Sequence, residues 1–373
     1  MASTAPPTIR LARNEDDGAI LEAFRRVYGP LGGGQCSPRE WRWRYGEQPL
    51  GRRSMIAVDG KGRVLAHYGA RAQRALVEGR WTVFLQAVDS FCEPRARGGL
   101  ARAGLFARVG RAFEEAFVGP PHGAADGGPE LDVERAPFIW GLPVLPAWRS
   151  GRSNLGYGHM RQLLLLVAEV EPAGPGERAG SPVAADARLE IRQLPPGEAL
   201  PASCDSLSRT LLLGTRAGVL RDRAWLEWRY RARPGVDYDI ALVERTGDLL
   251  GLAVARVCSA LAPAPPGQSS SREPGDAAPG LVICEWCVPA GDAARGVRGA
   301  LLKWARERAR AAGVGELRLH LGERSPEFTA LQGAGFSVRA TGRTVAAHSC
   351  LARRDLVWFA DHLEVSLGDT DLV

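Results

Sequence analysis

The order of apolar and polar positions in the first half of the chain predicts a helix, three strands and a further helix. Residues 14–29 predict a helix that begins at Asn14. Residues 54–60 (SMIAVDG) and 64–73 (VLAHYGARAQ) flank a Gly-rich turn and predict a β-hairpin, and residues 81–92 (WTVFLQAVDSFC) predict another strand. Four apolar residues at helical spacing follow: Leu105, Val109, Phe113 and Phe117. This half closes with a strand, a short helix and turn, and a last strand, over residues 136–144, 147–157 and 159–170.

The second half repeats this order of elements. Its pattern predicts a hairpin, a strand, a helix, a strand, a short helix and a strand, over residues 239–257, 281–288, 295–312, 316–321, 325–336 and 344–352. Such an order predicts an α+β fold, in which a mixed, mostly antiparallel sheet is flanked by helices.

The two halves also share residues at one fixed offset. The segment WRYGEQP from Trp43 aligns with WRYRARP from Trp228, and the offset of 185 continues without a gap to Arg71 and Arg256. Nine of these 29 positions are identical, and they include the rare residues Trp and Tyr. The sequence therefore predicts an internal duplication.

Stretches rich in Pro, Gly and Ser divide the chain, because such composition does not build a packed core. Residues 171–187 predict a linker between a first copy, residues 8–170, and a second copy, residues 188–373. Residues 259–280 predict an exposed loop inside the second copy.

Composition narrows the class of protein. The chain has 45% apolar and 24% charged residues, which is typical of a soluble globular protein. Its 48 Lys and Arg are interspersed with 42 Asp and Glu, so no nucleic-acid partner is expected. The longest apolar run, residues 163–168, is too short for a membrane span, and no secretory signal is visible.

The seven cysteines lack the spacing of a disulfide framework, and we expect a cytoplasmic protein. Cys284 and Cys287 are three apart in an apolar run that predicts a strand, so their side chains face opposite sides. We therefore expect buried structural cysteines and no metal site.

A turn rich in Arg and Gly joins the strand over 81–92 to the next helix. Free backbone N–H groups and the helix dipole favour an anion there, and glycines let a pyrophosphate approach closely. The candidate backbone residues are Arg97, Gly98, Gly99, Leu100 and Ala101, and the side chains of Arg95 and Arg102 add charge-assisted contacts. A capping turn that binds no ligand is the alternative.

Residues 87–106 (AVDSFCEPRARGGLARAGLF) resemble strand 4, the pyrophosphate loop and helix 3 of the GNAT superfamily of acyl-CoA-dependent N-acyltransferases, with a loop one residue shorter. Residues 330–338 (ALQGAGFSV) are similar to the stretch before that family's strand 6. The resemblance covers both copies, and tandem arrangements occur in the family.

The resemblance implies that acetyl-CoA binds in a V-shaped opening between strands 4 and 5, where Phe91 and Cys92 contribute to its binding. It also implies direct transfer of the acyl group to a primary amine of a small molecule. Such transfer needs a base for the ammonium, an oxyanion donor and an acid for the thiolate. Asp89 and Glu93 are the candidate bases, with Glu285 at the similar place in the second copy, unless these are only solvated carboxylates.

Two departures from the family pattern matter. The family's general-acid tyrosine falls on Arg152 in the first copy and on Leu331 in the second, so protonation of the thiolate depends on water or on another group such as Tyr157. Arg298 stands where the family prefers Gly or Ala, and its bulk is expected to crowd a pyrophosphate. We therefore assign the cofactor to the first copy.

Two further features have a structural and a functional interpretation. The tryptophan pairs Trp41 and Trp43, and Trp225 and Trp228, are expected to pack in the core or between the copies rather than to stack on a substrate. The last residues, LGDTDLV, carry Asp369 and Asp371 and are expected to be a solvated chain end, with an acceptor-site wall as the alternative.

Three functions are compatible with these patterns. The first is a tandem N-acetyltransferase that acts on a small amine. The second is a tandem module that binds CoA with little or no turnover, because the tyrosines are missing. The third is an aminoacyl-tRNA-dependent transferase for cell-wall precursors. The sequence does not determine the acceptor or the oligomeric state.

Overall fold

The computed structural model describes residues 6–29, 36–97, 104–120, 135–171, 189–259, 261 and 278–373. The strands of the first half are β1 (Thr8–Leu11), β2 (Arg53–Val58), β3 (Val64–Val77), β4 (Arg80–Cys92), β5 (Phe138–Gly141) and β6 (Gly158–Glu169). Its helices and helical turns are η1 (Asn14–Asp16), α1 (Asp17–Tyr28), α2 (Pro38–Trp41), η2 (Arg42–Gly46), η3 (Pro94–Ala96), α3 (Leu105–Phe117) and α4 (Leu145–Asn154).

The second half contains a similar series. Its strands are β7 (Glu190–Leu194), β8 (Ala217–Val219), β9 (Asp239–Arg245), β10 (Asp248–Cys258), β11 (Gly280–Cys287), β12 (Glu316–Leu319), β13 (Ser337–Ser349) and β14 (Leu363–Glu364). Its helices and helical turns are α5 (Ser203–Leu213), α6 (Arg223–Leu226), η4 (Glu227–Arg231), α7 (Ala294–Ala311), α8 (Pro326–Gly333), α9 (Leu356–His362) and η5 (Leu367–Asp369). The predicted α+β class is confirmed, whereas the pattern analysis did not predict α5, β7 or α9.

Local structure supports the internal duplication. The π-helical turns η2 and η4 begin and end 185 residues apart, and so do α2 and α6 before them. Each short helix is capped at its N-terminus by a side-chain oxygen, that of Ser37 in the first half and that of Asp222 in the second. Residues 185 apart therefore correspond in sequence, in helix capping and in helix type.

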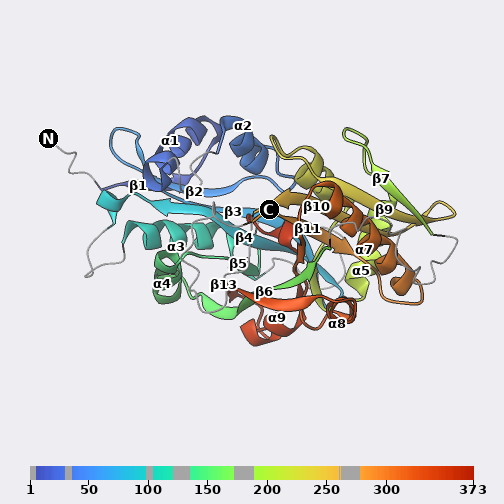
Figure 1. Cartoon of the computed structure of the whole chain (residues 1–373). Helices are drawn as coiled ribbons and strands as arrows, with labels where there is room; N and C mark the ends of the chain where they lie inside the picture. Colours follow the sequence, from blue (N-terminus) through green and yellow to red (C-terminus); the bar gives the residue numbers. More distant parts are fainter. Residues whose placement is uncertain are drawn as a thin grey trace.

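Within the described residues, fourteen strands form one sheet, whose main path is β1-β2-β3-β4-β5-β13-β6-β12-β11-β10-β9-β7. Figure 1 shows this sheet running through the whole molecule. The last strands of the two halves are exchanged: β13 pairs with β5 of the first half, and β6 pairs with β12 of the second. The halves are thus joined through the centre of the sheet, and the predicted domain limits stay a prediction.

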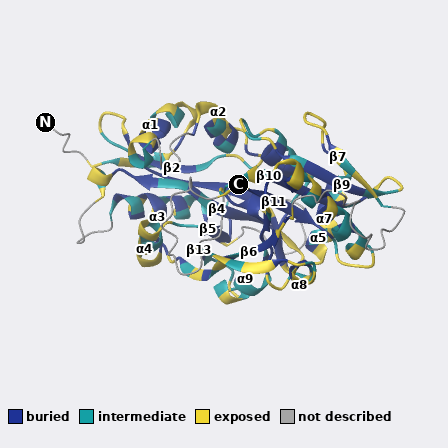
Figure 2. Cartoon of the chain, viewed as in Figure 1, coloured by how far each residue is buried: buried dark blue, intermediate teal, exposed yellow. Residues whose placement is uncertain are grey.

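Helices cover both faces of the sheet, and inner strands such as β4 and β11 are largely buried between them (Figure 2). On β2, Met55 and Ala57 pack on the side of α3, whereas Ile56 packs on the side of α1. This alternation follows from the two-residue period of a strand. The apolar residues Leu105, Val109 and Phe113 of α3 are buried in the same cluster as Met55, as the helical spacing predicts.

The two halves meet at a pair of stacked tryptophans. The rings of Trp43 and Trp228 lie 4.9 Å apart with an angle of 17° between their planes. Each indole donates to the backbone oxygen of the other residue, at 2.7 Å from Trp43 and 3.0 Å from Trp228. Because both residues are buried, the expectation of packing between the copies is confirmed.

The end of the chain lies in the middle of the molecule (Figure 1). Leu367, Asp369 and Thr370 are fully buried, and Val373 is 2% exposed. The expectation of a solvated chain end was therefore wrong, because this segment packs on both halves.

Among the described residues, no helix is both long and apolar enough to cross a bilayer.

Candidate active site

A pocket opens in the first half where two parallel strands separate. β4 and β5 pair from Phe84 and Phe138 to Gln86 and Trp140, and beyond this point they diverge. The space between them, here called the first opening, has a volume of about 170 Å³. Its walls include residues 87–90 of β4, residues 141–144 at the end of β5, and Tyr28, Tyr68, Phe106, Trp148, Leu155, Tyr157 and Asp371.

A β-bulge shapes the β4 wall of this opening. Tyr68 of β3 stands opposite two residues of β4, Asp89 and Ser90, and Asp89 has a φ of 51°. His67 holds the bulge, because its Nδ1 lies 2.9 Å from the Asp89 backbone oxygen and its Nε2 lies 2.6 Å from the Ser54 hydroxyl. Burial lowers the pKa of His67 to about 4, so the ring is neutral, donates to the Asp89 carbonyl and accepts from Ser54.

The predicted base Asp89 lies at the first opening and is already paired. Arg44 donates to its Oδ1 at 2.6 Å, and the Tyr45 hydroxyl donates to its Oδ2 at 2.9 Å. Burial raises the pKa of Asp89, but the Arg44 charge and hydrogen bond outweigh burial and lower this pKa below its ordinary value. The carboxylate is therefore ionised, with both oxygens occupied.

The predicted acid Tyr157 also lies at the first opening. Its hydroxyl is 2.9 Å from the hydroxyl of Tyr68, and both side chains are buried. Burial raises the pKa of each tyrosine well above its ordinary value, so both hydroxyls keep their protons at neutral pH. Tyr157 is thus a phenol within a pocket wall that can donate a hydrogen bond or a proton.

The second predicted base, Glu93, lies away from this opening. It is buried and forms ion pairs with Arg26 and Arg63, each at 2.7 Å. It is not among the described residues that line the first opening. Asp89 and Tyr157 are thus brought together, and Glu93 is separated from them.

The residues assigned to cofactor binding divide into three groups. Phe91 packs in the apolar cluster beneath α1, and Cys92 is buried on the opposite face, where burial raises its pKa. Arg95 is exposed, and Arg97 donates from Nε to the Cys92 backbone oxygen at 3.1 Å. The remaining candidates, Gly98, Gly99, Leu100, Ala101 and Arg102, lie outside the described residues.

The tail of the second half supplies a residue to this site. Asp371 lines the first opening, is exposed, and makes no hydrogen bond or ion pair with any other described residue. In the sequence, the apolar residues next to Asp371 indicate that this segment packs against the fold. One of them, Val373, is indeed buried. A carboxylate 282 residues from Asp89 in sequence thus reaches the same pocket.

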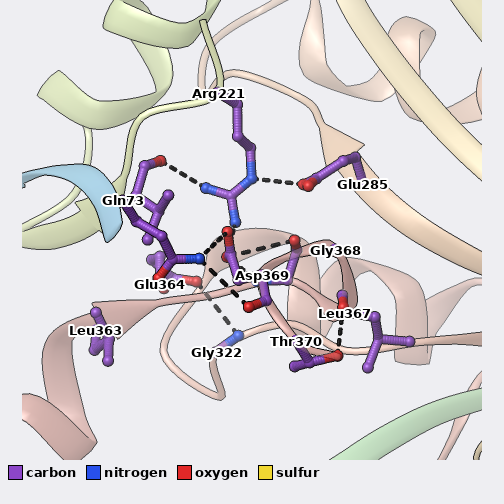
Figure 3. A network of polar contacts seen from close by, with 12 residues as sticks. Gln73, Arg221, Glu285, Gly322, Leu363, Glu364, Leu367, Gly368, Asp369 and Thr370 are labelled. Carbon is purple, nitrogen blue, oxygen red and sulfur yellow. Dashed lines mark hydrogen bonds and ion pairs between the residues drawn. The ribbon is translucent and has the colours of Figure 1, made fainter. Parts of the chain in front are cut away.

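A buried polar network holds the tail in place (Figure 3). Arg221 pairs with Asp369 of the tail and with Glu285 of β11. Gln73, from β3 of the first half, donates to the Asp369 backbone oxygen at 3.3 Å. Gly368 passes so close to Glu285 and Tyr230 that a Cβ atom there would collide with both. The network therefore joins the tail to both halves.

The second half has a matching opening. β11 and β12 pair in parallel as far as Ile283 and Leu319 and then separate, and the space beyond, here called the second opening, has a volume of about 600 Å³. A bridge crosses it: Arg298 of α7 donates to Glu327 of α8 at 2.7 Å, and the Trp286 indole donates to the same carboxylate at 3.0 Å. The side chain that the sequence analysis expected to obstruct this copy thus joins its two walls.

Comparison with known structures agrees with this topology. A GCN5-related N-acetyltransferase from Anabaena variabilis superposes with a TM-score of 0.60 at 10% identity, over 93% of this chain and 73% of that chain. The chain has the GNAT fold in two copies. A conserved protein of Enterococcus faecalis gives a TM-score of 0.58 at 10% identity, over 95% and 74% of the two chains. Eis1 from Mycobacterium abscessus gives 0.51 at 15% identity, over 92% and 74%.

At such identities the likeness defines the fold of this GNAT-like chain and leaves its activity open. No protein-family model and no curated protein sequence matches the chain. Among the described residues, no group of three or more His, Cys, Asp or Glu side chains is arranged to hold a metal ion.

Proposed function

We propose that the protein is an N-acetyltransferase that moves an acetyl group from acetyl-CoA to a primary amine of a small molecule, in the first opening. The observation that carries this proposal is the meeting of three features in one pocket. These are separated parallel strands with a bulge at Asp89, the protonated Tyr157, and the unpaired carboxylate of Asp371.

The residues present suit a thioester. The first opening is lined by apolar side chains, among them Phe106, Trp148 and Leu155, which suit the methyl group and the thioether chain of acetyl-CoA. Gly141 lies where a Cβ atom would come within 3.1 Å of the Ala87 carbonyl oxygen, so the backbones approach closely at the base of the opening. Acetyl-CoA supplies an activated acyl group when it is bound.

Proton transfers are assigned to two side chains. Asp371 takes a proton from the substrate ammonium, because it is the carboxylate of the pocket that is not held by a cation. As the new C–N bond forms and the C–S bond breaks, Tyr157 donates its proton to the departing thiolate, with Tyr68 orienting the hydroxyl. Asp89 keeps the bulge and its neighbours in position through Arg44 and Tyr45.

Two measurements test this function. Acetyl-CoA is expected to raise the melting temperature of the protein, and a panel of small primary amines is expected to contain substrates that release free CoA, detected by chromatography. Binding without CoA release by any amine supports the binding module instead. The absence of any acetyl-CoA effect on melting contradicts both interpretations.

A further inference from the structure

Three reactive side chains lie in a row next to the first opening. Cys350 directly follows β13, His348 belongs to that strand, and Glu114 belongs to α3. The Cys350 sulfur is 4.0 Å from His348 Nε2, and His348 Nδ1 is 3.5 Å from Glu114 Oε1. A thiol, an imidazole and a carboxylate are thus aligned across the two ring nitrogens, and this group is here called the Cys350 triad.

The environment of the ring favours its charged form. Neither His348 Nδ1 nor Glu114 Oε1 has a hydrogen-bond partner among the described residues. The two atoms lie 3.5 Å apart, and they form an ion pair when the imidazole is protonated. The neighbouring Cys350 and then Glu114 raise the pKa of His348 to about 10. An imidazolium therefore stands beside the Cys350 sulfur at neutral pH, with the Glu114 carboxylate on the other side of the ring. A cation next to the sulfur stabilises the negative charge that a cysteine carries when it attacks an electrophile.

The Cys350 triad is separate from the acyl-transfer residues. Neither Cys350 nor His348 lines the first opening. The His348 ring instead packs behind Tyr157, with 6.3 Å between the ring centroids, and covers Gly156. Cys350 thus lies behind the pocket wall formed by Tyr157 and is half-buried.

We propose that Cys350 is a reactive thiol and a site of covalent modification by low-molecular-weight disulfides. The Cys350 thiolate attacks one sulfur of the disulfide and forms a new S–S bond, while the original S–S bond breaks. The second sulfur leaves as a thiolate and takes a proton from solvent, so that one disulfide and one thiol give one mixed disulfide and one thiol. This inference does not depend on the proposed acetyl transfer.

The other cysteines provide an internal comparison. Five of them, Cys36, Cys92, Cys204, Cys284 and Cys287, are buried, and burial raises the pKa of each. Cys258 is half-buried like Cys350, but no hydrogen bond or ion pair joins its side chain to another described residue. Cys258 is therefore a matched control for exposure without an activating histidine.

The test treats the folded, full-length protein with oxidised glutathione or iodoacetamide at pH 7 and measures each cysteine by peptide mass spectrometry. Cys350 is expected to react about tenfold faster than Cys258, or more.

Two variants check the origin of the reactivity. His348→Asn is expected to bring the Cys350 rate to within about threefold of the Cys258 rate, and Glu114→Gln to lower it by a smaller factor, with Cys258 unchanged in both. If Cys350 reacts no faster than Cys258 in the wild-type protein, the proposal is wrong. An unchanged Cys350 rate in a folded His348→Asn variant overturns the activating role of the histidine. Should that variant fail to fold, the ratio of the Cys350 rate to the Cys258 rate in the wild-type protein decides.

Discussion

The two openings are built on the same strand topology and differ in what their side chains do. The first is small, about 170 Å³, and holds the protonated Tyr157 and the unpaired Asp371. The second is larger, about 600 Å³, but an ion pair between Arg298 and Glu327 bridges it. A duplicated frame thus provides two places for a ligand, and the residues in each place, rather than its volume, determine the chemistry.

Each half has a carboxylate that accepts a hydrogen bond from a tyrosine, and the two carboxylates have different partners and different roles. Tyr45 donates to Asp89 at 2.9 Å in the first half, and Tyr230, at the offset of 185, donates to Glu285 at 2.6 Å in the second. Each carboxylate lines the opening of its own half, but Asp89 pairs with Arg44, whereas Glu285 pairs with Arg221, which also binds Asp369. The second half therefore uses its carboxylate to anchor the tail that brings Asp371 to the first opening.

The largest effect is expected from filling the openings one at a time. Ala147→Trp places a large side chain in the first opening, whereas Ala294→Trp places the same side chain in the second. Ala147→Trp is expected to lower kcat/KM for acetyl transfer by about a thousandfold, because the thioester is excluded or displaced. Ala294→Trp is expected to change it by less than about threefold.

Both Trp variants are compared by transfer kinetics and by the acetyl-CoA effect on melting temperature. Loss of binding in Ala294→Trp alone would reverse the assignment and make the second opening the cofactor site.

The next largest effect concerns the acid. Tyr157→Phe removes the phenol from the first opening and is expected to lower kcat about a hundredfold, with little change in acetyl-CoA binding. Tyr68→Phe is the matched control, because it removes the other half of the same hydrogen bond. A smaller loss, about threefold to tenfold, is expected there. Equal losses in the two variants would show that the pair acts through packing rather than through proton donation.

The anchor of the tail predicts a pH dependence of stability. Burial raises the pKa of Asp369 to about 6 in the folded protein, from an ordinary value near 3.8. Between these values the folded state binds more protons than the unfolded state, so this group makes the protein less stable as pH rises from 4 to 6. Asp369→Asn lacks this contribution.

Urea unfolding at pH 4, 5, 6 and 7 measures this effect. The free energy of unfolding of Asp369→Asn, relative to the wild type, is expected to rise by about 2 kcal/mol between pH 4 and pH 7. Parallel stability curves for the two proteins would contradict a raised pKa for this residue.

The smallest effect is expected from the bridge in the second opening. Arg298→Ala removes the ion pair to the nearly buried Glu327 and is expected to lower the free energy of unfolding by about 1 kcal/mol. Acetyl transfer is expected to change by less than twofold. Arg295→Ala, at an exposed position of the same helix, is the control and is expected to leave both quantities unchanged. A strong loss of transfer in Arg298→Ala would mean that the second opening takes part in the reaction.

Local pattern predicted much of the site's frame. The strand over 81–92 and the helix through Leu105 and Phe117 appear as β4 and α3 with nearly the predicted bounds. Tyr157 was proposed because it lay near the position that lacks the family's tyrosine, and it does line the first opening. The segment that carries Asp371 was expected to be a solvated chain end, with an acceptor-site wall as the alternative, and Asp371 lines the first opening as that alternative proposes.

The sequence by itself determined what depends on neighbours along the chain: the element order and the duplication at an offset of 185. It also indicated that the tryptophans before each hairpin are packing residues, but the stacking of Trp43 on Trp228 comes from the structure. Only the tertiary structure decided the exchange of β6 and β13, the buried tail and the place of Asp371 beside Asp89 in the first opening. These features rest on contacts such as that of Gln73 with Asp369, which are 296 residues apart. No local period encodes such contacts, because they form only when both halves pack on one sheet.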